Sequence, residues 1–187
     1  MGAVTVRPVT IEEFDKLDLP ADKEWELRNG EIVDMSLPSV IHRHLQDRIC
    51  YLLRQALPTA VVLVEYSFQI ESTNDKRSAD VGLTTKERDL SARKAGILSG
   101  APELVMEVLS PTNTVMELRK YRRLCFEHGT KVFLIADPDD NTIEVYFETA
   151  KADSVLKPGD TLRLSLFGQN VTIPVAAIFT GITLSES

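Results

Sequence analysis

The stretch Ala101–Asn113, with the sequence APELVMEVLSPTN, constrains the fold of this chain more than any other part of it. Its centre, Glu103–Leu109, is an apolar run with the two-residue alternation of a buried strand. Glu107 lies inside this run, where burying a carboxylate costs free energy unless the group is paired or binds a metal. Pro111 cannot donate a hydrogen bond to a sheet, so it ends the strand, and a helix is expected next. The stretch therefore predicts a carboxylate on a central strand beside the start of a helix.

The rest of the chain predicts helices and hairpins without repeats or linkers. Apolar periodicity and capping signals predict helices at residues 11–17, 40–56 and 114–128, and the charged segment 85–95 is a further helix candidate. Alternating or β-branched runs predict strands at residues 25–28, 31–35, 61–70, 77–84, 103–109, 131–136, 142–147, 161–167 and 171–173. This order predicts a single α/β domain over residues 1–187, with a mixed sheet and helices packed on it.

The charge balance excludes some classes of protein. With 21 Lys and Arg against 28 Asp and Glu, the net charge is −7, which argues against a protein that coats DNA through a basic surface. An enzyme that meets phosphates through bound divalent cations remains possible, because such cations reverse the local sign of charge. No apolar run approaches the roughly 18 residues of a membrane span, and the N-terminus does not have the pattern of a secretory signal. We therefore expect a cytoplasmic protein without a membrane partner.

The cysteines and histidines do not predict a structural zinc site. Cys50 and Cys125 fall in apolar periodic segments, as buried free thiols in a reducing compartment do. The histidines, at positions 42, 44 and 128, are not spaced with them as zinc ligands are. A metal bound by this chain is therefore expected to use carboxylates.

Asp80 is another carboxylate that falls inside a predicted strand. Neighbouring strands could bring Asp80 and Glu107 side by side, and two carboxylates in contact imply a cation or a shared proton. Two carboxylates and a backbone carbonyl suit Mg²⁺ or Mn²⁺, which prefer oxygen ligands and can activate water for hydrolysis. The alternative is that Asp80 sits at a strand end and that Glu107 pairs with an arginine.

Several segments together resemble one protein family. They are Arg77–Val81 (RSADV), Ala101–Thr114 (APELVMEVLSPTNT) and Leu134–Pro138 (LIADP), together with Glu26–Glu31 (ELRNGE), His42 and the ending near residues 162–179. The resemblance is to the bacterial putative restriction endonuclease family of the PD-(D/E)XK nuclease superfamily, and it covers nearly the whole chain. It implies a restriction-endonuclease-like α/β fold, with a mixed central sheet flanked by helices and a β-hairpin near each terminus. It also implies Mg²⁺- or Mn²⁺-dependent cleavage of DNA.

The resemblance also assigns roles to residues. Asp80 matches the motif aspartate and Glu107 the motif glutamate, both metal ligands, and the carbonyl of Val108 could supply a further metal contact. In the wider superfamily a lysine stands two residues after the glutamate, where this chain has Leu109. The family resembled here takes a lysine from the following helix instead, and this chain has Tyr121 at that position.

Two basic residues of that helix could replace the missing lysine. On a helical wheel centred on Leu118, Arg122 lies at about 40° and Lys120 at about 200°. The wheel favours Arg122, on the buried face, as the cation that reaches the carboxylates, and a one-residue shift in alignment would select Lys120. Arginine binds phosphate but does not act as a general base, so its role would be charge stabilisation.

Family position singles out two accessory candidates. Glu31 opens a predicted strand and could add a third acidic group, or it is an exposed glutamate on an edge strand. His42 begins a predicted helix and could contact phosphate or hydrogen-bond within the first turn, or it is a structural or solvated histidine.

Three functions from different classes follow. The first is a metal-dependent endonuclease that hydrolyses DNA phosphodiester bonds, as a homodimer if it cuts both strands. The second is a nuclease-fold protein without catalysis that acts as a binding or assembly module, which Leu109, Tyr121 and the acidic charge favour. The third is a metal-dependent hydrolase of a substrate other than nucleic acid.

Overall fold

The structure is a computed structural model that describes residues 7–111, 113–147 and 152–182. Both ends of the predicted domain, residues 1–187, lie outside the described residues, and so does Thr112 in the segment APELVMEVLSPTN. None of the helices within these ranges is long and apolar enough to cross a membrane.

The predicted α/β fold class, with a mixed sheet and a hairpin near each terminus, is confirmed. The helices are α1 (Ile11–Phe14), α2 (Val40–Ala56), α3 (Lys86–Ala95), α4 (Val115–Glu127) and α5 (Val175–Phe179), with a 3-10 turn, η1, at Glu71–Thr73. The strands are β1 (Glu24–Arg28), β2 (Glu31–Met35), β3 (Ala60–Ile70), β4 (Asp75–Thr85), β5 (Leu98–Ser99), β6 (Leu104–Val108), β7 (Val132–Asp137), β8 (Thr142–Tyr146), β9 (Ser154–Leu156), β10 (Thr161–Leu166) and β11 (Gln169–Pro174). The short strands β5 and β9 have no counterpart among the predicted elements.

Side-chain caps fix where the helices begin. The side-chain oxygens of four cap residues each accept a backbone N–H of the first turn: Thr10, Ser39, Thr85 and Thr114. At α4 the cap is reciprocal, because the Glu117 side chain also accepts the backbone N–H of Thr114. These caps set the first turns of α2 and α4, the two helices that carry residues of the site described below.

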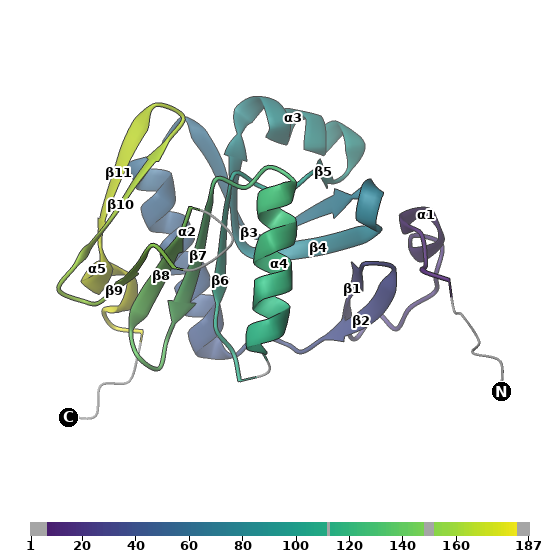
Figure 1. Cartoon of the computed structure of the whole chain (residues 1–187), viewed down its shortest axis with the longest axis horizontal. Helices are drawn as coiled ribbons and strands as arrows, with labels where there is room; N and C mark the ends of the chain where they lie inside the picture. Colours follow the sequence, from purple (N-terminus) through teal and green to yellow (C-terminus); the bar gives the residue numbers. More distant parts are fainter. Residues whose placement is uncertain (1–6, 112, 148–151, 183–187) are drawn as a thin grey trace.

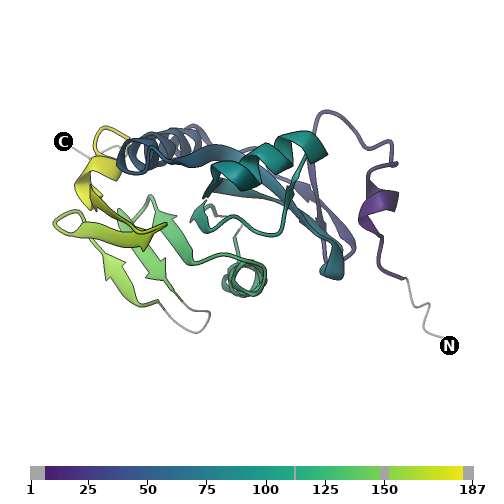
Figure 2. The same ribbon diagram turned by 90° about the horizontal axis from the view of Figure 1, so that it is seen from above.

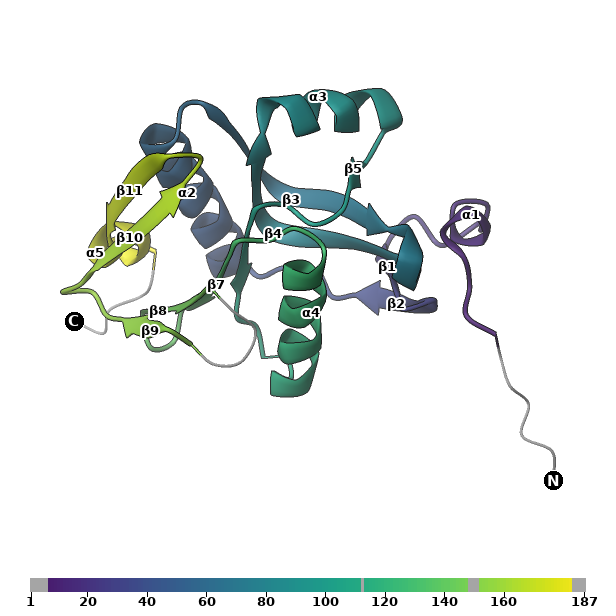
Figure 3. The same cartoon turned by 45° about the horizontal axis from the view of Figure 1, so that its top comes forward.

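The main sheet divides at β4. Along one edge, β4 pairs with β3 from Asp75 to Thr85, with an interruption at Asp80 and Glu65. Along the other edge it pairs with β1 at Lys76 and with β6 at Val81–Leu83. Residues 77–80 lie between these two pairings, and we call this segment the fork. Figure 3 shows the long β3–β4 ribbon, which continues from the body of the sheet toward β1 and β2.

The order of strands through the fork is β2-β1-β4-β6-β7-β8-β9. β6 and β7 are parallel, with Glu107 opposite Ile135, and the other pairings along this path are antiparallel. β6 therefore lies in the interior of the sheet, as its apolar sequence predicts, and α4 lies in front of the sheet in Figure 1.

Two apolar cores cover the two faces of the sheet. Met106 and Leu134 belong to the core under α2, α5 and the β10–β11 hairpin. The residues that precede them in each strand, Val105 and Phe133, belong to the core under α4. Seen from above in Figure 2, the blue helix α2 and the green helix α4 lie on opposite sides of the sheet. The site at the fork can therefore receive side chains from both helices.

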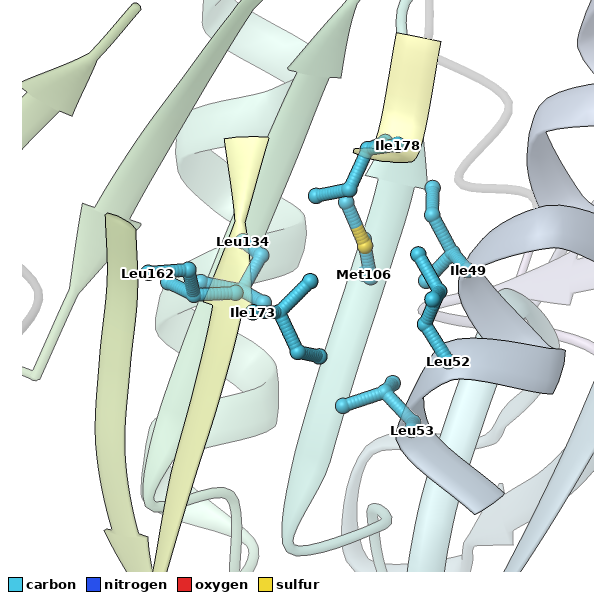
Figure 4. Close-up of a pocket in the computed structure, with 8 residues that line it drawn as sticks. All are labelled: Ile49, Leu52, Leu53, Met106, Leu134, Leu162, Ile173 and Ile178. Carbon is cyan, nitrogen blue, oxygen red and sulfur yellow. The ribbon is translucent and has the colours of Figure 1, made fainter. Parts of the chain in front are cut away.

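A hollow in the first core is lined entirely by aliphatic and thioether side chains. Those of Ile49, Met106, Leu134 and Ile178 point toward one another from α2, β6, β7 and α5 (Figure 4). This hollow offers no polar group to a substrate or metal, so it belongs to the packing of the core.

Candidate active site

Carboxylate side chains bridge the fork where a strand is missing. The backbone N–H of Ser78 donates to Glu26 Oε1 at 2.9 Å, and that of Asp80 donates to Glu107 Oε1 at 3.2 Å. The Ser78 carbonyl accepts a hydrogen bond from the Tyr121 hydroxyl at 3.3 Å. Because backbone polar groups away from water need partners, these side chains replace the missing strand.

Asp80 and Glu107 are held together by a reciprocal pair of hydrogen bonds. Glu107 accepts the backbone N–H of Asp80, and Asp80 Oδ2 accepts the backbone N–H of Val108 at 2.7 Å. The register pairs of β4 and β6 end at Val81 and Met106, which are the sequence neighbours of Asp80 and Glu107. The predicted approach of the two carboxylates therefore occurs at the end of this ladder, where the strands separate.

Glu107 is a carboxyl group whose charged form is disfavoured. Burial raises the pKa of the Glu107 carboxyl well above its ordinary value, and the negative charge of Asp80 raises it further. Within the described residues, no arginine, lysine or histidine forms an ion pair with Glu107, so the predicted alternative of an arginine partner does not hold there. Two carboxylates in contact favour a bound cation or a shared proton.

Helix α2 orients Asp80 from the other side. Asp80 Oδ1 contacts His42 Nε2 at 3.1 Å and accepts a hydrogen bond from Gln46 Nε2 at 3.0 Å. Burial lowers the pKa of His42, but the hydrogen bond and charge of Asp80 outweigh it, so the pKa lies above its ordinary value. The structure thus places His42, one of the two accessory candidates, beside Asp80.

Gln46 and Glu65 were missed in the sequence. The Gln46 amide nitrogen also donates to the Glu65 carboxylate. Gln46 is a polar residue on the apolar face of α2, one turn after His42, and that placement was the available signal. Glu65 lies on β3 with a left-handed backbone, φ 48°, between the register partners that flank Asp80. Glu65 lies inside the apolar run of the predicted strand 61–70, so the signal that singled out Glu107 was also available for Glu65.

Helix α4 contributes Tyr121, at the position where the family resemblance placed a lysine. Its ring packs against Phe68 and Phe133, with centroid distances of 6.3 and 5.8 Å. The Arg77 guanidinium lies 4.2 Å from the ring centroid. Burial raises the pKa of Tyr121 well above its ordinary value, so the residue at this position is a neutral phenol.

Arg77 is a half-buried cation within the fork itself, and the sequence did not single it out as a site residue. Its Nε donates to Glu26 Oε2 at 2.9 Å, and Nε of Arg28 donates to the same oxygen at 2.8 Å. Glu26 is only 6% exposed. The guanidinium groups of Arg77 and Arg28 are therefore paired with Glu26, and within the described residues neither forms an ion pair with Asp80 or Glu107.

Three residues expected at the site lie elsewhere. Arg122 is buried, as the helical wheel indicates, but its guanidinium lies 3.8 Å from the ring centroid of Tyr146 on β8. Lys120 is exposed. Glu31 is exposed and pairs in register with Arg28 at the turn of the β1–β2 hairpin, which docks on β4 at Lys76, away from Asp80. The helical face was predicted correctly for Arg122, but its neighbour on that face was not.

The donor set fits a hard divalent cation. Asp80 and Glu107 supply carboxylate oxygens, and the Val108 carbonyl adjoins them. In the described ranges no three His, Cys, Asp or Glu side chains form a metal-binding group. A cation here would rely on backbone and water for its other ligands, as Mg²⁺ commonly does.

Comparison with known proteins identifies the family of this chain. A family model described as Uma2, putative restriction endonuclease, matches residues 11–176. The chain belongs to the Uma2 family. A search of curated proteins finds no match.

A solved structure shares the Uma2 fold seen here. It is the crystal structure of a putative nuclease belonging to DUF820 from Anabaena variabilis ATCC 29413. The two chains superpose with a TM-score of 0.81 at 21% sequence identity, over 94% of this chain and 99% of that chain. The likeness extends over nearly all of both chains and shows a common fold.

Proposed function

We propose that this protein is a metal-dependent endonuclease that hydrolyses DNA phosphodiester bonds, with Mg²⁺ or Mn²⁺ held by Asp80, Glu107 and the Val108 carbonyl. The observation that carries the proposal is the Asp80–Glu107 pair at the fork, joined by reciprocal hydrogen bonds and without an ion pair to Glu107 in the described residues. Membership of the Uma2 family supports the nuclease class and a nucleic acid substrate.

A divalent cation bound here would supply Lewis acidity toward water and toward the phosphate oxygens. The protein's own residues prepare the ligands. His42 and Gln46 hold one oxygen of Asp80, and the Val108 N–H holds the other. The Asp80 N–H holds Glu107. The carboxylates are thus oriented before binding, which avoids reorganisation when charge develops on the phosphate.

The nuclease proposal is tested by nicking of supercoiled plasmid DNA in millimolar Mn²⁺. Asp80→Asn and Glu107→Gln keep side-chain size and remove one negative charge each. Each should lower the cleavage rate by about a thousandfold or more. Asp34→Asn is the matched control, because Asp34 is exposed and pairs with Lys23 on the surface. Cleavage that persists at the unaltered rate in both site variants would contradict the proposal.

A second function, a binding or assembly module with the nuclease fold, is favoured by Tyr121. A neutral phenol stands where the resemblance placed a lysine, and Leu109 is apolar at the other expected lysine position. This function predicts that the unaltered protein binds duplex DNA and Mn²⁺ without cleaving the DNA. The nicking assay therefore separates it from the first.

A further inference from the structure

Both carboxylate oxygens of Asp80 are held by polar contacts from the protein. Its Oδ1 contacts His42 Nε2 and Gln46 Nε2, at 3.1 and 3.0 Å. Its Oδ2 accepts the Val108 N–H at 2.7 Å. A carboxylate has about four lone-pair positions, two on each oxygen. The contacts from α2 occupy Oδ1, and the position that remains is on Oδ2, the oxygen held by β6.

Gln46 is the buried member of the group that restrains Asp80. It is 3% exposed, and its single amide nitrogen donates to both Asp80 and Glu65. A primary amide has two N–H donors, so both are used. If the amide were rotated by half a turn, its oxygen would face two carboxylates. Glu65 and Asp80 therefore fix the orientation of Gln46 between them.

Glu65 reaches Gln46 from an unusual backbone conformation. A φ of 48° is uncommon for a residue other than glycine or asparagine, and such conformations persist where surrounding contacts maintain them. Glu65 lies on β3 between Val64 and Tyr66, which pair with Val81 and Ala79 of β4, on either side of Asp80. The sheet thus places the Glu65 carboxylate where it can hold the far side of the Gln46 amide.

We propose that Gln46 is a positioning residue for Asp80 and that Glu65 holds the Gln46 amide in the donating orientation. The proposal rests on the proposed function, because it assigns Asp80 Oδ2 as the oxygen left for a divalent cation. Residues that orient a metal ligand from behind commonly change metal affinity by about 10- to 100-fold when they are removed. Gln46 and Glu65 act through Asp80 and need not touch the substrate.

The test is a calorimetric titration with Mn²⁺ on matched variants. Gln46→Met keeps the length of the side chain and removes the amide, and it should weaken Mn²⁺ binding about tenfold or more. Glu65→Gln retains a carbonyl acceptor for the Gln46 amide and should bind Mn²⁺ within about twofold of the unaltered protein. Glu65→Met removes that acceptor and should weaken binding as Gln46→Met does. Asp34→Asn again serves as the control.

The Glu65 pair also distinguishes positioning from direct ligation. If Glu65 were itself a metal ligand, Glu65→Gln would lose affinity together with Glu65→Met, and the proposal would be overturned. Unchanged Mn²⁺ affinity in a folded Gln46→Met protein would overturn it as well. Because Glu65 is exposed, its variants remain informative if Gln46→Met fails to fold.

A metal-free measurement separates this inference from the nuclease proposal. The Val108 N–H reports on Asp80 through their 2.7 Å hydrogen bond. The amide proton resonance of Val108 should therefore move upfield in Gln46→Met and Glu65→Met and stay in place in Glu65→Gln. Failure of the unaltered protein to cleave DNA would contradict the proposed function. The shift of the Val108 resonance would still test the positioning role, because it is measured without metal or DNA. A Val108 resonance unchanged in all variants would overturn the positioning role even if DNA is cleaved.

Discussion

Two glutamates at the fork receive the same backbone contact in opposite electrostatic settings. Glu26 accepts the N–H of Ser78, and Glu107 accepts that of Asp80, two residues further along β4. Glu26 also accepts from Arg77 and Arg28, so its charge is balanced within the protein. Glu107 faces Asp80, a second carboxylate, and its pKa is raised. Glu26 is thus paired with two arginines of the protein, whereas Glu107 has no ion pair within the described residues and is the proposed ligand of a divalent cation.

The largest expected change in stability is the one that follows from neutralising Glu26. Glu26→Gln should lower the free energy of unfolding by about 3 kcal/mol, because Arg77 would keep its charge without its principal acceptor. Urea unfolding at neutral pH measures this change. A loss below about 0.5 kcal/mol would mean that Arg77 is not balanced through Glu26.

The same substitution at the other end should act in the opposite direction. Glu107→Gln removes a charge that burial and Asp80 disfavour, so the metal-free protein should gain on the order of 1 kcal/mol. Urea unfolding in the presence of a chelator measures it. A destabilisation as large as that of Glu26→Gln would show that Glu107 has an internal partner after all.

The pH dependence of stability follows from the raised pKa of Glu107. Because the folded state binds this proton more tightly than the unfolded state, the contribution of Glu107 falls as pH rises above the ordinary carboxyl range. The raised pKa of His42 has the same sign, and its contribution is lost as pH rises through the folded value. We therefore compare the free energy of unfolding of the metal-free unaltered protein with that of Glu107→Gln. The difference should favour the unaltered protein more at pH 5 than at pH 7, and urea titrations of both proteins at each pH measure it.

The smallest effects on Mn²⁺ binding are expected at the predicted site residues that lie away from Asp80 and Glu107 in the structure. Glu31→Gln and Lys120→Met should each change the Mn²⁺ dissociation constant by less than about twofold, because exposed charges at a distance are screened by solvent and salt. Calorimetry on the two variants checks this. A tenfold loss in either would restore the role that its sequence position suggested.

Local pattern was enough to predict the strand that carries Glu107. Alternation and Pro111 defined β6, and the strand pattern also singled out Asp80. The α/β fold follows from the same periodicities, and the family resemblance agrees with it. These features depend on neighbours in sequence, which a single chain displays directly.

Long-range placement could not be predicted in the same way. A helical wheel gives the face of Arg122, but its contact is Tyr146, from a strand that follows later in the chain. The hairpin around Glu31 was predicted, and its docking at Lys76 was not. Gln46 acquires its role only when α2 packs beside Asp80. These three errors concern tertiary neighbours, whereas the elements that were missed are the two short strands β5 and β9.

The most direct test of the difference between the two glutamates is a calorimetric titration of metal-free protein with Mn²⁺. The unaltered protein should show saturable binding, Asp80→Asn and Glu107→Gln should show none, and Glu31→Gln should match the unaltered protein. This result would show that the unbalanced carboxylate pair is the cation site. Equal Mn²⁺ binding by Glu107→Gln and the unaltered protein, or no binding by the unaltered protein, would contradict it.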